Sequence, residues 1–202
     1  VEKLRHAVDE LSAGKGGVRL IMGAAGAGKS RLRDELRVQA QGRHLRIWRG
    51  AGRTAGGSLG QLFQDFFAAT AQEISGRPER REWLGKEGPI LAHYFPALRE
   101  HADPVGYIPI EGAAEEARLM VAIYEFFDRL LRTEKILLLA DDLHQADPLS
   151  IKLLAHLAIS FTGISAAAPE AKPLLIITGV REAEAIGPVN DFLKSLTTKA
   201  ES

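Results

Sequence analysis

The sequence contains no cysteine, and this absence excludes three classes of protein at once. A disulfide-stapled scaffold, a zinc ribbon and a thiol nucleophile all require cysteine side chains. The absence fits a reducing compartment, so we expect a cytoplasmic location. Long apolar runs are also missing, since the longest, 136–140 and 174–177, are far shorter than the ~20 residues that span a membrane. The N-terminus lacks the apolar stretch of a signal peptide, so we expect no membrane partner.

The sequence has no excess charge of either sign. Lysine plus arginine number 26 and aspartate plus glutamate also number 26, so the formal net charge is zero. A domain that grips nucleic acid over a whole face carries an excess of basic residues. The balance excludes such a domain-wide basic surface but not a local basic patch, and we expect no direct nucleic-acid binding from this domain. What is present is an ordinary globular composition, with 46% hydrophobic and 26% charged residues over 202 positions, a length that suits one domain.

Short apolar runs alternate with amphipathic helical patterns along the chain. Apolar runs without alternation are typical of parallel strands buried on both faces, so this order predicts an α/β fold with a parallel sheet. Strands are predicted at 18–22, 45–48, 136–140 and 174–178. Helices are predicted at 1–13, 30–41, 59–67, 113–132, 148–161 and 191–198. Prolines and glycines within 75–111 predict short helices joined by turns, and we interpret this stretch as a helical insertion.

The segment Gly23–Ser30 (GAAGAGKS) matches the pattern G-x-x-x-x-G-K-[ST]. Glycines let the backbone turn tightly and bring N–H groups close to phosphate oxygens, and the following helix points its positive end at the same anion. Lys29 is predicted to neutralise the β- and γ-phosphates, and the Ser30 hydroxyl to bind Mg²⁺. An ordinary glycine–alanine turn is the alternative, but the position between a strand and a helix favours a nucleotide site. The predicted nucleotide-binding residues here are Gly23, Ala24, Ala25, Gly26, Ala27, Gly28, Lys29 and Ser30.

Two aspartates follow the predicted strand 136–140 directly. A buried parallel strand delivers such carboxylates to the ligand-binding edge of the sheet. Mg²⁺ on a triphosphate needs only one or two protein carboxylates, and Asp141 is predicted to supply one. Asp142 is then predicted to be the general base that polarises the attacking water. The alternative for this pair is a helix N-cap, which aspartate also favours.

The segment 141–148 (DDLHQADP) resembles the D-D-L-H-W-A-D-P signature of STAND-type AAA+-related ATPases. These are the origin-recognition-like modules of large bacterial regulators of the LuxR and adenylate-cyclase kinds. Three more segments are similar to the family: Arg31–Leu32 to G-K-[ST]-R-L, 95–98 (FPAL) to F-P-x-L, and 174–184 (LLIITGVREAE) to its sensor element. Arg118–Leu119 also opens the helix before the acidic strand, as in the family. The resemblance covers nearly the whole chain.

The resemblance implies a three-layer P-loop NTPase fold of the additional-strand AAA+ type, with the acidic and sensor strands beside the phosphate-loop strand. It adds Arg31 to the nucleotide-binding residues and makes Arg181 a catalytic sensor arginine near the γ-phosphate. The alternative for Arg181 is a surface pair with Glu184. The resemblance further implies ATP and ADP as ligands, Mg²⁺ as cofactor, and hydrolysis that acts as a conformational switch in signalling or transcription control.

The chain departs from the family pattern at two positions of this signature. Gln145 replaces the usual tryptophan, and Asp142 stands where many AAA+ ATPases have glutamate. The shorter carboxylate leaves hydrolysis available but suggests that it is slow. The neighbouring His144 is either an acid–base group or, as we favour, a structural turn residue.

Family members also carry a fifth core strand and a winged-helix lid after the sensor strand. The segment 179–202 shows no convincing strand, so we expect 1–202 to be an ATPase domain cut from a larger protein and lacking these two parts. The expected partners are then the neighbouring winged-helix, helical-repeat and effector domains of the parent chain. Nucleotide-dependent self-association is a further expectation.

Two other functions remain open. The first is a nucleotide-gated scaffold with negligible hydrolysis, because no arginine supplied by a second molecule can be identified. The second is a small-molecule kinase, which shares the glycine loop but needs an acceptor pocket and usually an arginine-rich lid. The signature at 141–148 argues against the kinase.

Overall fold

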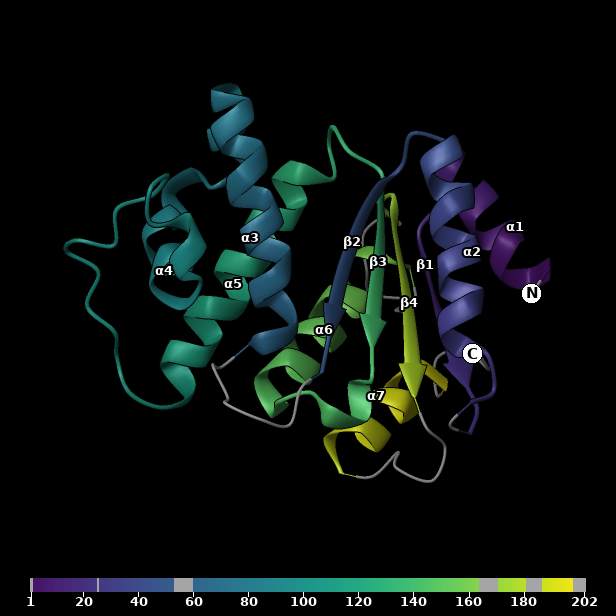
Figure 1. Cartoon of the computed structure of the whole chain (residues 1–202). Helices are drawn as coiled ribbons and strands as arrows, with labels where there is room; N and C mark the ends of the chain where they lie inside the picture. Colours follow the sequence, from purple (N-terminus) through teal and green to yellow (C-terminus); the bar gives the residue numbers. More distant parts are fainter. Residues whose placement is uncertain (1, 25, 53–59, 164–170, 181–186, 198–202) are drawn as a thin grey trace. The chain divides into compact units, whose positions relative to one another are not determined.

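The computed structural model divides into two compact units (Figure 1). The first comprises Val1–Leu62 and Glu134–Ser202, and the second Phe63–Thr133. The residues that the structure describes are 2–24, 26–52, 60–163, 171–180 and 187–197. No helix among these residues has the length and apolar character needed to cross a membrane.

A parallel four-stranded sheet forms the centre of the first unit. Its strands are β1 (Gly17–Met22), β2 (Arg46–Ala51), β3 (Ile136–Asp141) and β4 (Leu174–Val180), in the order β1-β4-β3-β2. One strand therefore lies between the strand before the glycine loop and the strand that ends in the acids. This is the additional-strand arrangement, and the predicted α/β class with a parallel sheet is confirmed.

The register brings the carboxyl ends of the strands to one edge of the sheet. Met22 pairs with Val180 at the ends of β1 and β4, and Ala51 pairs with Asp141 at the ends of β2 and β3. Chain segments that follow these four residues therefore start close together. Ligands of open parallel sheets bind at this edge, so the sheet itself positions the site.

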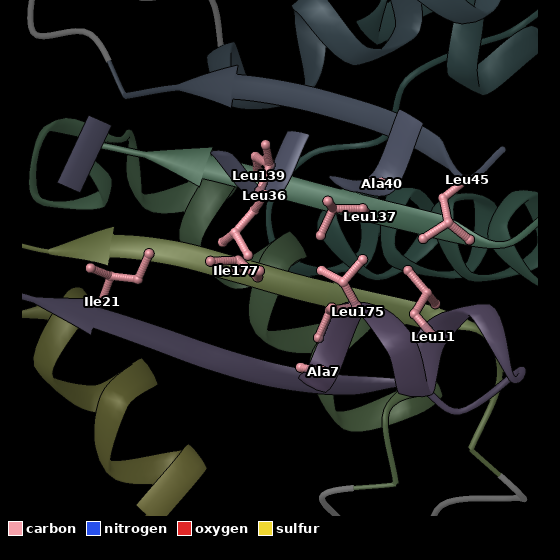
Figure 2. Packing of buried hydrophobic residues seen from close by; sticks show 11 residues of the cluster. Ala7, Leu11, Ile21, Leu36, Ala40, Leu45, Leu137, Leu139, Leu175 and Ile177 are labelled. Atoms are coloured by element: carbon pink, nitrogen blue, oxygen red, sulfur yellow. The ribbon is translucent and has the colours of Figure 1, made fainter. Parts of the chain in front are cut away.

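Helices cover both faces of the sheet, as a parallel sheet requires. The helices of this unit are α1 (Glu2–Ser12), α2 (Lys29–Gly42), α6 (Pro148–Phe161) and α7 (Pro188–Thr197). Apolar residues of α1 and α2 pack on Leu137, Leu139, Leu175 and Ile177, which point to the same side of β3 and β4 (Figure 2). Leu138 and Ile176, which alternate with these residues along β3 and β4, are buried as well. Successive side chains of a strand point to opposite faces, so these two lie on the face of the sheet that α6 covers (Figure 1).

The second strand begins later and runs further than the sequence predicted. Leu45, the first residue of the predicted strand, donates its N–H to the carbonyl of Ala40 at 3.1 Å and so belongs to the turn that ends α2. The strand then continues through Gly50 to Ala51, residues that composition alone assigns to a loop. Pairing with β3 explains the difference, because neighbouring strands decide where a ladder ends.

The second unit is helical and has an aromatic core. Its elements are α3 (Gln61–Gly76), whose first two residues belong to the first unit, η1 (Pro78–Trp83), η2 (Gly85–Glu87), α4 (Gly88–Tyr94), η3 (Pro96–Leu98) and α5 (Ala113–Leu130). Phe67 stacks on Phe95 with ring centroids 4.1 Å apart, and Phe66 stacks on Phe127 at 5.2 Å. Short helices occupy the stretch 75–111 as far as Leu98, and residues 99–111 form turns and irregular backbone. The status of the stretch as an insertion stays a prediction.

A buried carboxylate holds the loop before α5 in place. Glu115 accepts hydrogen bonds from the Tyr94 hydroxyl at 2.8 Å, the Ile110 N–H at 3.1 Å and the Arg118 guanidinium at 3.3 Å, and from the Tyr107 hydroxyl. Burial raises the pKa of Glu115, but these hydrogen bonds outweigh it and hold the pKa below its ordinary value. The carboxylate thus stays ionised and joins three parts of the unit.

We predict that Glu115→Gln destabilises the protein by about 1–3 kcal/mol, because an amide cannot accept all four hydrogen bonds and leaves buried donors without partners. The measurement is the free energy of unfolding in urea. Glu111→Gln is the matched control, since Glu111 is exposed. Equal stability of the two variants would contradict the structural role of Glu115.

Candidate functional site

The glycine loop connects the end of β1 to the start of α2. Gly26 and Gly28 have φ angles of 79° and 81°, in the left-handed region that glycine adopts without strain. Gly28 is the N-cap of α2, which begins at Lys29 and has no acidic residue in its first turn. Backbone N–H groups at this helix end therefore remain available to an anion. Ala25 lies outside the described residues.

The Lys29 side chain folds back over the loop. Its Nζ donates to the carbonyl oxygens of Gly23 at 2.7 Å and of Ala24 at 2.8 Å. The ammonium thus lies among the backbone groups of the loop, where a phosphate also has to bind. Both acceptors are uncharged carbonyls, so phosphate oxygens offer Lys29 stronger partners.

The acidic end of β3 turns sharply after Asp141. Asp142 has φ 45° and ψ 46°, a left-handed conformation that aspartate tolerates better than most residues. Its carbonyl accepts the Gln145 N–H at 2.8 Å, which opens the short helix η4 (Leu143–Gln145). Asp141 and Asp142 nevertheless both act on one side chain, Arg33, the first by an ion pair and the second by its nearby charge.

Arg33 joins the two halves of the site. One guanidinium nitrogen, Nη2, donates to Ser30 Oγ at 2.8 Å, and the other, Nη1, forms an ion pair with Asp141. The Arg33 and Asp141 side chains are only 13% and 15% exposed. Burial lowers the pKa of Arg33, and the nearby charge of Asp142 opposes that shift. Residues far apart in the sequence, Ser30 and Asp141, therefore meet at one guanidinium.

The same two oxygen ligands suit a magnesium ion. The Ser30 hydroxyl and the Asp141 carboxylate are hard oxygen donors, and both already contact a single cationic group. Mg²⁺ keeps several waters when it binds nucleotide, so two protein oxygens are enough. The described residues hold no group of three or more histidine, aspartate or glutamate side chains that could bind a metal by itself.

Comparison with known proteins assigns the chain to a family. A family model described as AAA ATPase domain matches residues 1–177. The chain belongs to this family. The predicted AAA+-related P-loop ATPase domain is thereby confirmed at the level of the family, and nucleotide binding is the property that the family carries. No curated protein and no solved structure matches the chain.

Gly52 of the AAA ATPase domain lies directly against the acidic turn. Its N–H donates to the Asp141 carbonyl at 2.9 Å. A Cβ at this position would lie 2.4 Å from the Asp142 carbonyl oxygen and 2.5 Å from the Ala146 nitrogen, too close for any side chain. Gly52 lies in a glycine-rich stretch of the sequence, 50–57, in which no local pattern distinguishes it from the other glycines.

Asp147, the third aspartate of the signature, ties the start of α6 to residues 60–61. Its carboxylate accepts the Ser150 N–H at 2.9 Å and the Ser150 hydroxyl at 2.6 Å, which caps α6. It also accepts the N–H groups of Gly60 at 3.1 Å and Gln61 at 3.0 Å. Burial raises the pKa of Asp147, but the four hydrogen bonds outweigh it and the pKa is lowered.

Arg31, His144 and Arg181 are the remaining candidate residues of the site. Arg31 is exposed on α2 and lines a cavity of about 410 Å³ beside the loop, together with Met22 and Lys29. His144 lies within η4, the position of a turn residue. Arg181 follows Val180 in the sequence but lies outside the described residues, as does Glu184.

We predict that Gly52→Ala destabilises the domain by about 1–3 kcal/mol and weakens nucleotide binding, because the added Cβ displaces the acidic turn. Thermal unfolding and a nucleotide-binding titration measure the two effects. Gly42→Ala is the control, since a Cβ on Gly42 meets no atom within 4 Å. A Gly52→Ala variant as stable as this control would show that the close approach is unimportant.

We predict that Asp147→Asn costs about 1–2 kcal/mol at neutral pH, because the amide nitrogen cannot accept hydrogen bonds. A lowered pKa in the folded state means that the carboxylate adds stability above its ordinary pKa, about 3.9. That contribution is lost as the pH falls through the folded-state pKa. The gap between wild type and variant should therefore shrink in acid, as measured by urea unfolding between pH 7 and pH 3. A constant gap would exclude the proposed cause.

Proposed function

We propose that the domain binds ATP with Mg²⁺ and hydrolyses it. The observation that carries this proposal is the meeting of the helix end at Lys29–Ser30 with Asp141 through a single side chain, Arg33. A glycine loop by itself suits many phosphate ligands. A strand-end carboxylate that is bridged by one side chain to the serine of the loop is the arrangement that a nucleotide–magnesium complex needs.

The loop binds the phosphates through its backbone N–H groups and through Lys29. Backbone N–H groups of Gly26–Lys29 face the phosphate oxygens, and the Lys29 ammonium exchanges its carbonyl partners for the β- and γ-phosphates. Ser30 and Asp141 hold Mg²⁺, which when bound neutralises charge on the β- and γ-phosphates. The cavity beside Met22 and Arg31 offers space to the outer part of the nucleotide.

Hydrolysis is assigned to Asp142. Its carboxylate accepts a proton from water as the water oxygen attacks the γ-phosphorus, and the bond to the β-phosphate oxygen breaks to release ADP. Arg181, which follows the last residue of β4, is proposed to stabilise charge on the transferred phosphoryl group. This assignment rests on the family resemblance of the segment 174–184.

We further propose that the domain works as a switch in a signalling or transcription-regulatory protein of the STAND kind. Support comes from the segment 141–148, whose similarity to that group extends beyond the two acids to Asp147 and Pro148. In such a protein the partners are winged-helix, helical-repeat and effector domains, and the nucleotide state decides how they associate. The cytoplasmic location stays a prediction.

Two variants separate binding from hydrolysis. Lys29→Ala should weaken ATP binding roughly tenfold to a hundredfold, since it removes charge-assisted hydrogen bonds to phosphate. Asp142→Asn should bind ATP like wild type but release phosphate about a hundredfold more slowly, as expected for loss of a general base. Fluorescent ATP binding and phosphate release measure the two properties.

The controls carry the same changes at exposed positions, Lys3→Ala on α1 and Asp191→Asn on α7. Equal ATP binding by wild type and Asp142→Asn, with phosphate released by both only at the background rate, would contradict the proposed hydrolysis. That result would support a nucleotide-gated scaffold. If Lys29→Ala binds ATP as tightly as its control Lys3→Ala, the proposed nucleotide site itself is contradicted.

A further inference from the structure

Arg33 occupies the place where a metal ion is expected. It lies three residues after Ser30 on α2, so both side chains point from the same face of the helix. Its two terminal nitrogens contact Ser30 Oγ and Asp141, the two proposed Mg²⁺ ligands. A guanidinium that touches both oxygens leaves no room for a cation between them.

Charge explains why the arginine lies there. The Asp141 side chain is 15% exposed, and a carboxylate so far removed from water is costly unless a cation pairs with it. Asp142 adds a second negative charge close to Arg33, while Arg49 adds a positive one. Without a metal ion, Arg33 is the cation in contact with Asp141 among the residues that the structure describes.

We infer that Arg33 is a resident counter-ion that Mg²⁺ must displace when nucleotide binds. This inference rests on the proposed nucleotide site and adds its regulation. Arg33 contacts Asp141 at Oδ1 and Ser30 at Oγ. A metal ion bound to these same two oxygens competes with the guanidinium for them, and the repulsion between the two cations is strong where water is largely excluded. Binding of the metal is therefore coupled to movement of the Arg33 side chain. Only molecules in which Arg33 has left Ser30 and Asp141 can bind Mg²⁺, so the apparent affinity for Mg²⁺ falls as that fraction falls.

A purely structural role for Arg33 makes a different prediction. If the arginine only ties α2 to the end of β3, its removal loosens the site and weakens both nucleotide and metal binding. If it competes with the metal, its removal strengthens metal binding. The sign of the change in Mg²⁺ requirement therefore separates the two roles, and it does not depend on catalytic activity.

The experiment titrates Mg²⁺ into the full chain with a fluorescent ADP held at fixed concentration, and measures the Mg²⁺ concentration at half-maximal binding. For Arg33→Gln we expect this concentration to fall roughly threefold to tenfold. Arg33→Lys keeps the charge but loses the two-pronged contact, so we expect a smaller fall. Arg37→Gln, which removes the same charge one helical turn further along α2, should resemble wild type within about twofold.

Thermal unfolding in EDTA establishes that each variant is folded, and if Arg33→Gln is not, Arg33→Lys carries the comparison alone. An unchanged or raised Mg²⁺ requirement in the folded Arg33 variant would overturn the inference while leaving the nucleotide site intact. A fall of equal size in Arg37→Gln would also overturn it, because the effect would then be one of general charge. Failure of wild type to bind ADP at any Mg²⁺ concentration would instead contradict the proposed function, and the inference with it.

Discussion

The parallel alignment of the four strands is the constraint on which the site depends. Because Met22 pairs with Val180 and Ala51 with Asp141, the chain leaves all four strands at one edge. Parallel strands require crossover connections, and helices of those crossovers cover the faces of the sheet. The edge at the carboxyl ends is left for loops, and so the glycine loop and the acidic turn meet there although they are far apart in the sequence.

Two cationic side chains at this edge already have hydrogen-bond or ion-pair partners within the protein. Lys29 is held by carbonyls of Gly23 and Ala24, and Arg33 by Ser30 and Asp141. Under the proposed function, a nucleotide with its metal ion therefore binds by exchanging these partners for its own groups. The free energy of binding is then the difference between the free energy of the new contacts and that of the contacts given up. A small change in either set of contacts therefore changes the binding affinity.

Features with a local cause could be predicted from the sequence. Apolar runs located the strands, the spacing of Gly23, Gly28 and Lys29 located the phosphate loop, and the position of Asp141 after an aliphatic run placed it at the strand end. Even the cap of α6 lies where Pro148 indicates a helix start. In each case a few neighbouring residues determine the outcome.

Features that depend on tertiary contact were missed. Arg33 follows a helix start with two other arginines nearby, and only the position of β3 distinguishes it. Gly52 is one glycine among several, and its importance comes from the backbone of the acidic turn 2.4 Å from its missing Cβ. Leu45 looked like a strand residue because its apolar character does not reveal that its N–H completes the turn after α2.

The acidic signature also anchors both ends of a connecting segment. Gly52 donates to Asp141, while Gly60 and Gln61 donate to Asp147 six residues further along the same signature. The carboxyl end of β3 and the cap of α6 are therefore each tied to a different part of the chain. Any displacement of the signature displaces Gly52 and Gly60 together, although other residues separate these two glycines in the sequence.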